Sequence, residues 1–139
     1  MDAAVIDIVL RFQRAVAPAM ELLDEVYRRS GRSAGQNRLL LAIAADGTDV
    51  RTIRSQLSLD SGYLSRLLRA LEREKLVRLV QSATDRRVRT VQLTDQGRRD
   101  RARLAEATYH AARSMMAPLS PAQRSRLVAA MSAVNEIWA

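Results

Sequence analysis

Two spacings of apolar residues divide the chain into helical and extended segments. From about Ala3 to Arg29, apolar residues recur every three or four positions, which predicts one long helix that contains Pro18 as a candidate kink. Ser30 and Gly31 end this helix, because glycine readily takes the left-handed conformation of a helix C-cap. A second helix, mostly buried, follows an N-cap at Ser33.

A short helix and a longer amphipathic helix come next. Asp46-Gly47 breaks the preceding helix, Thr48 or Asp49 caps the short helix, and Ser58-Leu59-Asp60 forms a turn. The helix from Ser61 to about Lys75 has a leucine stripe that must face a core: Leu64, Leu67, Leu68 and Leu71. Its opposite face is polar and rich in arginine: Ser61, Gly62, Tyr63, Ser65, Arg66, Arg69 and Arg73. Two helices joined in this way predict a helix-turn-helix.

The spacing then changes to the alternation of β-strands. Residues 77–81 and 88–93 alternate in polarity and are rich in β-branched side chains, while residues 82–85 have the composition of a turn. This pattern predicts a β-hairpin with Arg86 and Arg87 at its tip. A hairpin in this position is the wing of a winged helix.

Two further helices complete the chain. Thr94 caps a helix from about Asp95 to Met116, Pro118 ends it, and Ser120-Pro121 starts the last helix. The expected fold class is therefore mainly α with a small β-hairpin wing, a winged helix-turn-helix flanked by N- and C-terminal helices.

The formal net charge is +8, and all of the excess lies in the middle of the chain. Between Arg51 and Arg103 there are 14 basic and 6 acidic residues, whereas the rest of the chain holds 9 of each. Only Lys75 is a lysine, so nearly all of this charge is guanidinium, which donates two hydrogen bonds at once to guanine or phosphate. Codon bias in a GC-rich genome would explain the number of arginines, but not their location. A basic centre between neutral flanks favours a nucleic-acid-binding segment on a scaffold.

The composition excludes several kinds of site. Without cysteine the chain has no disulfide and no thiolate metal site, and a single histidine excludes a histidine-rich one, so no cofactor is expected. The N-terminus lacks the features of a signal peptide, and no apolar run approaches the roughly 20 residues of a transmembrane helix. We therefore expect a cytoplasmic protein with no membrane partner.

Two other classes of function compete with DNA binding. An enzyme is disfavoured, since there is no glycine-rich phosphate loop and no Ser-His-Asp set, and His110 is interpreted as a surface or interface histidine. A helical protein whose basic middle binds an acidic partner or a membrane needs a free apolar face, whereas the leucine stripe is committed to a core. Salt-dependent binding with sequence preference would separate these classes.

The wing and the residues after it resemble a known family. The family pattern is an Asp-x-Arg pair, apolar strand residues and Leu-Thr-x-x-Gly. Here it occurs without a gap as Asp85-Arg86-Arg87, Val88, Val91 and Leu93-Thr94-Asp95-Gln96-Gly97. Together with the order of the helices, this pattern resembles the MarR family of bacterial winged helix-turn-helix transcriptional regulators over nearly the whole chain.

The resemblance implies a homodimer that binds double-stranded DNA. Residues 1–32 and 98–139 would form the helical dimerisation region, and residues 33–97 the winged helix-turn-helix domain. The amphipathic helix would enter the major groove and Arg87 the adjacent minor groove, with Asp85 orienting Arg87 through a carboxylate–guanidinium pair; a solvated turn pair is the alternative. The DNA-binding residues implied are Ser61, Gly62, Tyr63, Ser65, Arg66, Arg69, Asp85, Arg86, Arg87 and Arg89.

Within this set, three residues at the start of the helix have distinct expected roles. Gly62 cannot contact a base with a side chain. Tyr63 would take over part of that contact, or else pack under the wing. Ser61 lies near the helix start, where backbone N–H groups would meet a phosphate.

The expected role is a repressor released by a small aromatic or anionic ligand, bound between the DNA-binding lobe and the dimer helices. Candidate neighbours of such a ligand are Phe12, Met20, Arg32 and Arg38. The alternatives are a nonspecific or architectural DNA-binding protein, or the DNA-binding part of a longer fusion protein. The fusion remains open because residues 59–72 also resemble MarR-type domains fused to an acetyltransferase.

Three residues depart from the family pattern. Lys75, at the end of the amphipathic helix, and Ser58, in the turn, stand where the family often has glycine. Arg54 stands where a small alanine often packs between the two helices of the motif. The turn geometry is therefore expected to differ in this chain.

Overall fold

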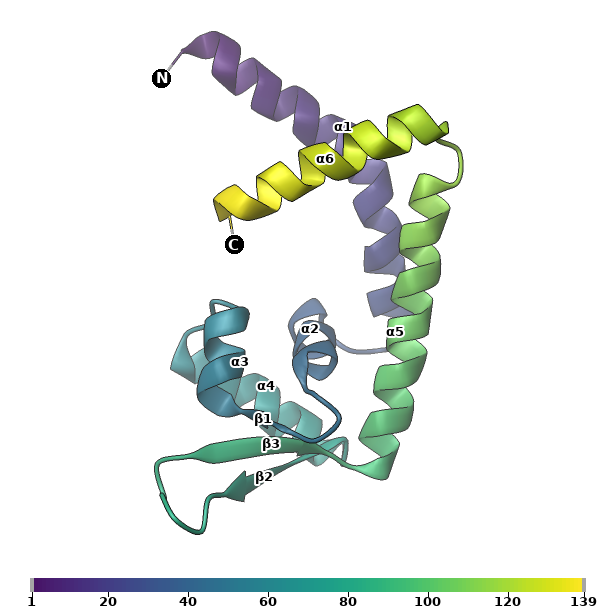
Figure 1. Ribbon diagram of the computed structural model, residues 1–139. Coiled ribbons are helices and arrows are strands. Elements are labelled where there is room, and N and C mark those ends of the chain that lie inside the picture. Colours follow the sequence, from purple (N-terminus) through teal and green to yellow (C-terminus); the bar gives the residue numbers. More distant parts are fainter. Residues whose placement is uncertain (1, 139) are drawn as a thin grey trace.

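Six helices and three short strands make up residues 2–138, the part of the chain that the computed structural model describes (Figure 1). In chain order the elements are α1 (Ala3–Arg29), α2 (Ala34–Ala42), β1 (Thr48–Asp49), α3 (Val50–Gln56), α4 (Ser61–Arg73), β2 (Val77–Gln81), β3 (Arg89–Leu93), α5 (Asp95–Met116) and α6 (Pro121–Trp138). The prediction of a mainly helical fold with a small antiparallel wing is confirmed. We call α4 the reading helix.

Side-chain caps and one glycine set helix ends where the sequence predicts them. The Ser33 hydroxyl accepts a hydrogen bond from the Gln36 N–H at 3.2 Å, and the Gln36 side chain accepts the Ser33 N–H at 2.8 Å. The Thr94 hydroxyl accepts the Gly97 N–H at 3.0 Å and so starts α5. Gly31 has a φ of 73°, the left-handed conformation that ends α1. These local interactions satisfy backbone groups that a helix end leaves free.

The predicted hairpin is formed by β2 and β3, and a third strand, β1, which was not predicted, joins it. The strand order is β1-β3-β2, with Thr48 opposite Val91 and Asp49 opposite Thr90. Asp49 also caps α3 as predicted, since its carboxylate accepts the Arg51 N–H at 2.7 Å. A two-residue strand shows no alternation, and its partner lies some forty residues further along the chain. Only the tertiary fold brings the two together.

The core lies between α2, α4, α5 and the sheet. The predicted leucine stripe of the reading helix is buried, and it packs with apolar residues of the other elements: Leu39, Leu40, Ile43, Ile53, Leu76, Val77, Val91, Leu93 and Leu104. Each such side chain contributes roughly 1.5–3 kcal/mol of burial free energy. The reading helix is therefore held from behind and exposes its polar face.

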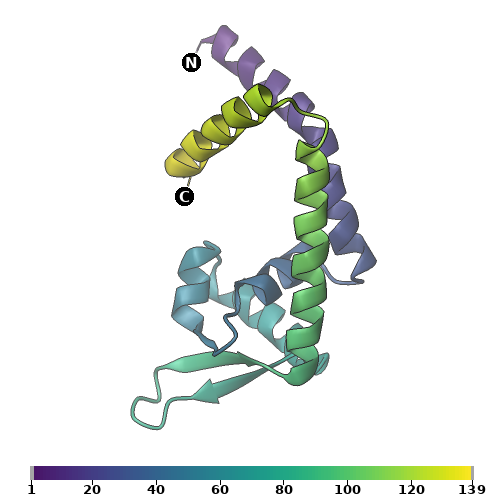
Figure 2. The same ribbon diagram turned by 45° about the vertical axis from the view of Figure 1, so that its right-hand side comes forward.

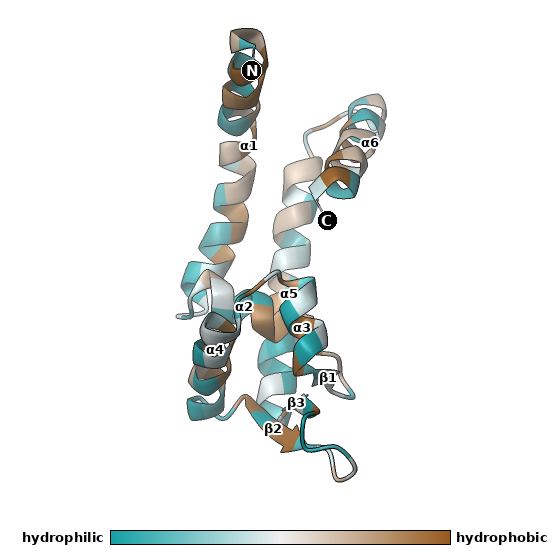
Figure 3. Cartoon of the chain, turned by 90° about the vertical axis from the view of Figure 1, so that its left-hand side faces the viewer, coloured by the Kyte–Doolittle hydropathy of each residue, from teal (hydrophilic) through white to brown (hydrophobic). Residues whose placement is uncertain are grey.

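The two terminal helices extend away from this core (Figures 1 and 2). Neither α1 nor α6 has a buried residue among those described, although α1 runs beside α5. Figure 3 shows apolar residues along the outer part of α1. Exposed large apolar side chains on the two helices are Val5, Ile6, Ile8, Val9, Leu10, Phe12, Met20, Leu22, Leu127, Val128, Met131, Ile137 and Trp138. So much contiguous apolar surface is typical of an interaction face.

Two of the three departures from the family pattern coincide with unusual backbone geometry. Ser58 has a φ of 50° and Lys75 a φ of 60°, the positive values among non-glycine residues in the described range. Both therefore take the left-handed conformation that glycine adopts without cost. Ser58 and Lys75 therefore take a glycine-like backbone conformation, and the strain is carried by these residues themselves.

Candidate nucleic-acid interface

The reading helix presents a polar, arginine-bearing surface because its leucines are buried on the opposite side. Asp60 caps the helix by accepting the Tyr63 N–H at 2.9 Å. Ser61, Gly62, Arg66 and Arg69 are exposed, while Ser65 is half-buried. One of the first-turn N–H groups expected to meet a phosphate near Ser61 is therefore already hydrogen-bonded to the Asp60 carboxylate.

Tyr63 is turned toward the core rather than outward. Its side chain is half-buried and packs against the core, and its hydroxyl lies over Gly35, where a Cβ would overlap it. The Arg66 guanidinium lies 5.6 Å from the centre of the Tyr63 ring. The alternative of packing against protein is therefore supported for Tyr63, although against α2 and not under the wing. Arg66 is exposed at the surface of the reading helix, and Tyr63 is half-buried beside it.

A small basic pocket joins the reading helix to α3 and the wing. Its volume is about 120 Å³, and it is lined by Val50, Arg51, Arg54, Ser61, Leu64, Ser65 and Arg89. The Arg54 guanidinium donates to the Ser61 hydroxyl at 3.0 Å, so the arginine that replaces a small residue bridges the two helices of the motif. Arg51 and Arg54 were not among the predicted site residues. Their place in the basic central segment was the only signal for them.

The wing tip is held by backbone hydrogen bonds. The Asp85 carboxylate accepts the Arg87 backbone N–H at 2.9 Å, and the Asp85 carbonyl accepts the Val88 N–H at 3.0 Å. The Gln81 side chain donates to the Arg86 carbonyl at 2.6 Å. No ion pair joins Asp85 to the Arg87 guanidinium within residues 2–138. The predicted carboxylate–guanidinium pair is therefore corrected: Asp85 shapes the turn and leaves the guanidinium free.

The arginines nearest this surface differ in how they are paired. Arg51 forms an ion pair with Asp49 at 3.1 Å, which raises the pKa of Arg51, and the charge of Asp85 adds to that effect. The same contact lowers the pKa of Asp49. In the described part of the chain, a second group of arginines has no carboxylate partner: Arg66, Arg69, Arg73, Arg86, Arg87 and Arg89. We call these the unpaired arginines.

The unpaired arginines come from the reading helix and the wing, both of which belong to the lobe opposite the ends of α1 and α6. Figure 2 shows the hairpin projecting from the base of this lobe. The structure therefore places the ten predicted site residues on two elements of one lobe, with Tyr63 and Ser65 less accessible than the others. A helix and an adjacent hairpin with free guanidinium groups have the geometry to contact neighbouring grooves of a duplex.

Other kinds of site are not found in the described chain. Within residues 2–138, no group of three histidine, cysteine, aspartate or glutamate side chains is arranged to hold a metal ion. None of the described helices is long and apolar enough to cross a membrane.

Comparison with known proteins agrees with this geometry. Residues 45–97 match the family model described as "Winged helix DNA-binding domain". No curated protein matches the sequence at a significant level. Solved structures, however, are similar over almost the full length.

Three solved regulators illustrate this likeness. The PcaV transcriptional regulator from Streptomyces coelicolor, solved with its natural ligand, has a TM-score of 0.69 and 23% identity over 98% of this chain and 96% of that one. The S. aureus MepR–DNA complex has a TM-score of 0.75 and 19% identity over 98% of both chains. A MarR-family transcriptional regulator from Rhodococcus sp. RHA1 has a TM-score of 0.73 and 18% identity over 96% of both. Residues 45–97 are thus similar to a winged helix DNA-binding domain, and nearly the whole chain has the fold seen in MarR-family transcriptional regulators.

Proposed function

We propose that this protein is a homodimeric, sequence-specific DNA-binding transcriptional regulator that acts as a repressor and is released by a small ligand. The observation that carries the proposal is the group of unpaired arginines on the reading helix and the wing. A guanidinium that no carboxylate neutralises inside the protein is available to phosphates and to guanine edges. The proposal is not enzymatic, in line with the regulators to which the fold is similar.

In the proposed complex the reading helix and the wing contact different grooves of the DNA. Arg66 and Arg69 project from the reading helix and would face the major groove, with Ser61 and Ser65 near the phosphates. Arg87 would enter the adjacent minor groove, where narrow A·T-rich segments attract guanidinium groups. The backbone hydrogen bond from Arg87 to Asp85 fixes the start of that side chain, which reduces the entropy lost on binding. The solved MepR–DNA complex shows that one protein of this fold binds DNA.

The homodimer is proposed from the exposed apolar faces of α1 and α6. A pocket of about 190 Å³ between them is lined by Phe12, Leu127, Ala130, Met131, Val134 and Asn135, nearly all apolar. A second copy of the chain would cover this surface and would bring two reading helices to successive half-sites, as two-fold symmetric operators require. We keep residues 1–32 and 98–139 as the proposed dimerisation region and residues 33–97 as the proposed DNA-binding domain. Binding to the chromosome would place the protein in the cytoplasm, at the nucleoid.

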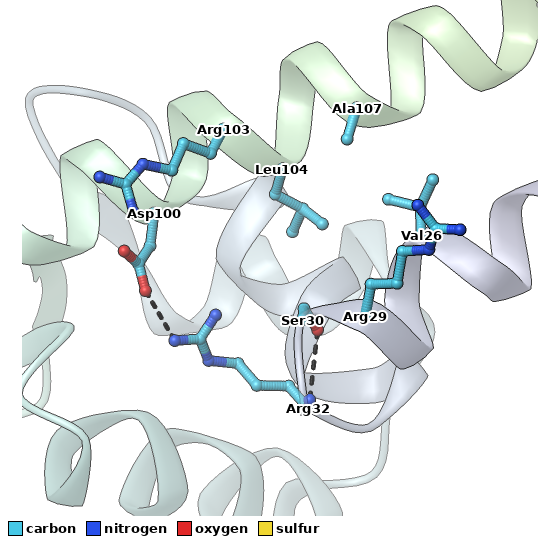
Figure 4. A pocket seen from close by; sticks show the side chains of 8 residues that line it. All are labelled: Val26, Arg29, Ser30, Arg32, Asp100, Arg103, Leu104 and Ala107. Carbon is cyan, nitrogen blue, oxygen red and sulfur yellow. Dashed lines mark hydrogen bonds and ion pairs between the residues drawn. The ribbon is translucent and has the colours of Figure 1, made fainter.

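A cavity at the junction of the two regions supports the ligand part of the proposal. Its volume is about 320 Å³, and Val26, Arg29, Ser30, Arg32, Asp100, Arg103, Leu104 and Ala107 line it (Figure 4). Arg103, which has no carboxylate partner among the described residues, lies there beside the apolar side chains of Val26, Leu104 and Ala107, and this suits a small anion with an apolar body, such as an aromatic carboxylate. The other two arginines of the cavity, Arg29 and Arg32, are already paired with carboxylates. Of the four candidate neighbours taken from the sequence, Arg32 lines this cavity. Phe12 lies at the α6 pocket, Arg38 lies beside the α3–α4 turn, and Met20 is exposed on α1.

The test is binding to a labelled DNA fragment that flanks the protein's own gene, in competition with random DNA at two salt concentrations. We expect a specific complex, one dimer on a roughly palindromic site, that survives a large excess of competitor and weakens as salt rises. Equal competition by random DNA would overturn the regulator proposal and favour a nonspecific or architectural DNA-binding protein, or the DNA-binding part of a longer fusion protein. Release of the complex by candidate aromatic carboxylates would then identify the ligand class.

A further inference from the structure

Arg32 joins parts of the chain that belong to different helices. It lies in the connection between α1 and α2, and its Nε donates to the Glu74 carboxylate at 2.7 Å. Its Nη2 donates to the Asp100 carboxylate, also at 2.7 Å (Figure 4). The side chains of Arg32 and Asp100 are each only 15% exposed, and that of Glu74 is 37% exposed. Two short, charge-assisted hydrogen bonds in a partly desolvated place are much stronger than an ordinary surface pair.

The two carboxylates come from elements whose relative position matters for DNA binding. Glu74 is the C-cap of the reading helix, and Asp100 lies in the first turns of α5, the helix that leads to the α6 end of the molecule. The Gln36 side chain adds a longer contact of 3.5 Å to Glu74 from α2. One guanidinium therefore ties the end of the reading helix to the base of α5.

The backbone of Arg32 is itself held in place. The Asn37 side chain is fully buried, and it donates to the Arg32 carbonyl at 3.3 Å and to the Ser30 hydroxyl at 2.9 Å. Burial by itself lowers the pKa of Arg32, but the hydrogen bonds to Glu74 and Asp100 outweigh it, so the pKa lies above its usual value. The guanidinium stays charged, and it is anchored at both ends of the side chain.

We propose that Arg32 is a positioning residue that fixes the angle of the reading helix relative to α5, and with it the spacing of the two reading helices in the dimer. This inference rests on the proposed function, because the spacing matters only when two copies bind one operator. Arg32 touches no predicted DNA-binding residue, so it acts through Glu74 and Asp100. Substitution of Arg32 should therefore reduce affinity most for DNA on which the dimer must contact both half-sites together.

The test compares Arg32→Gln with a matched control, Arg28→Gln. Arg28 also forms an ion pair, but its partner Glu25 is in the same helix, at 2.9 Å, and its side chain is 70% exposed. Each variant is titrated against an operator with both half-sites and against a fragment with one half-site. We expect Arg32→Gln to lose about tenfold in affinity for the full operator and to bind the single half-site as the unmodified protein does. Arg28→Gln should match the unmodified protein on both.

Two outcomes would overturn the positioning role. An equal loss on both fragments would mean that Arg32 only supports the fold, and no loss on the full operator would mean that the contacts to Glu74 and Asp100 do not control the spacing. Arg32→Lys should recover only part of the loss, because a single ammonium group does not span the two carboxylates as a guanidinium does. If the unmodified protein shows no preference for the operator, the proposed function fails instead.

A measurement without DNA tests the positioning role of Arg32 even if the protein shows no preference for the operator. The chain contains no cysteine, so spin labels can be attached at Arg66→Cys on the reading helix and Arg113→Cys on α5, both exposed positions. Labelled chains diluted with unlabelled ones report the distance within one subunit by double electron–electron resonance. We expect Arg32→Gln to broaden or shift this distance and Arg28→Gln to leave it unchanged. An unchanged distribution in Arg32→Gln would contradict the proposal.

Discussion

The α-carbon of Gly97 lies against the backbone carbonyl of Leu76, so that any Cβ at Gly97 would overlap the carbonyl oxygen. This contact seats the first turn of α5 on the segment that leaves the reading helix. Thr94 strengthens it, since its hydroxyl donates to the Lys75 carbonyl at 2.6 Å and its N–H donates to the Leu76 carbonyl at 2.9 Å. The Leu-Thr-x-x-Gly motif therefore packs the start of α5 against the segment between the reading helix and β2.

Gly97→Ala should destabilise the fold strongly. The added methyl group meets backbone rather than a flexible side chain, so α5 must shift away from Leu76 at a cost of about 3 kcal/mol. Thermal or urea denaturation measures the change. Gly62→Ala is the control, because a methyl group at exposed Gly62 would meet only side chains, of which Asp60 is the nearest, at 3.3 Å, and should change stability by no more than about 1 kcal/mol. Similar stability of the two variants would contradict the packing role of Gly97.

Arg87→Ala should weaken operator binding and leave the oligomeric state unchanged. The lost guanidinium–groove contact is expected to cost about 1–3 kcal/mol of binding free energy. Arg78→Ala is a suitable control, since Arg78 is exposed in the same hairpin but hydrogen-bonds Gln92 at 3.2 Å, away from the tip. Both variants are titrated on the same DNA fragment. Equal affinities of Arg87→Ala and Arg78→Ala would refute the role assigned to the wing tip.

Asp85→Asn and Asp85→Ala should behave differently. Asparagine keeps an oxygen that can accept the Arg87 backbone N–H, and it removes a negative charge that would face phosphates. We therefore expect Asp85→Asn to bind DNA at least as well as the unmodified protein, and Asp85→Ala to bind more weakly because the turn loses its hydrogen bond. If Asp85→Asn weakens binding as much as Asp85→Ala does, the carboxylate charge matters and an ion pair forms in the complex.

Lys75→Gly should stabilise the fold. The φ of 60° at this position costs a residue with a Cβ roughly 1 kcal/mol, whereas glycine adopts it freely. The midpoint of thermal unfolding is expected to rise by a few degrees. Ser58→Gly relieves the same kind of strain in the turn and should act in the same direction. Lys75→Ala serves as the control, because alanine keeps the Cβ and should leave stability close to that of the unmodified chain.

Phe12→Glu should prevent dimerisation. Phe12 is exposed and lines the apolar pocket between α1 and α6, where a buried carboxylate without a partner would be costly. Sedimentation or light scattering should show monomers, and binding to a two-half-site operator should be lost. Gln13→Glu adds the same charge to an exposed neighbouring position and should leave the dimer intact. A dimeric Phe12→Glu variant would show that the subunits meet through another surface.

The sequence by itself determined the features that depend on residues close together in the chain. Helix positions followed from apolar spacing and from caps such as Ser33 and Thr94, because those interactions span three or four residues. The leucine stripe of α4 likewise predicted the buried face of that helix, and the alternation in β2 and β3 predicted the hairpin. The basic central segment indicated where DNA binding is to be sought.

Only the tertiary structure decided contacts between distant residues. The pairing of β1 with β3, the packing of Tyr63 on Gly35 and the addition of Arg51 and Arg54 to the basic surface depend on how the elements assemble. The hydrogen bond from Arg32 to Asp100 joins residues 68 positions apart, and no local pattern marks either of them. Even within the wing tip, the path of the turn determines that the Asp85 carboxylate accepts a backbone N–H of Arg87 and does not pair with the Arg87 guanidinium. A hydrogen bond forms only within a narrow range of distances and angles, so small differences in the positions of these atoms determine which partner each group binds.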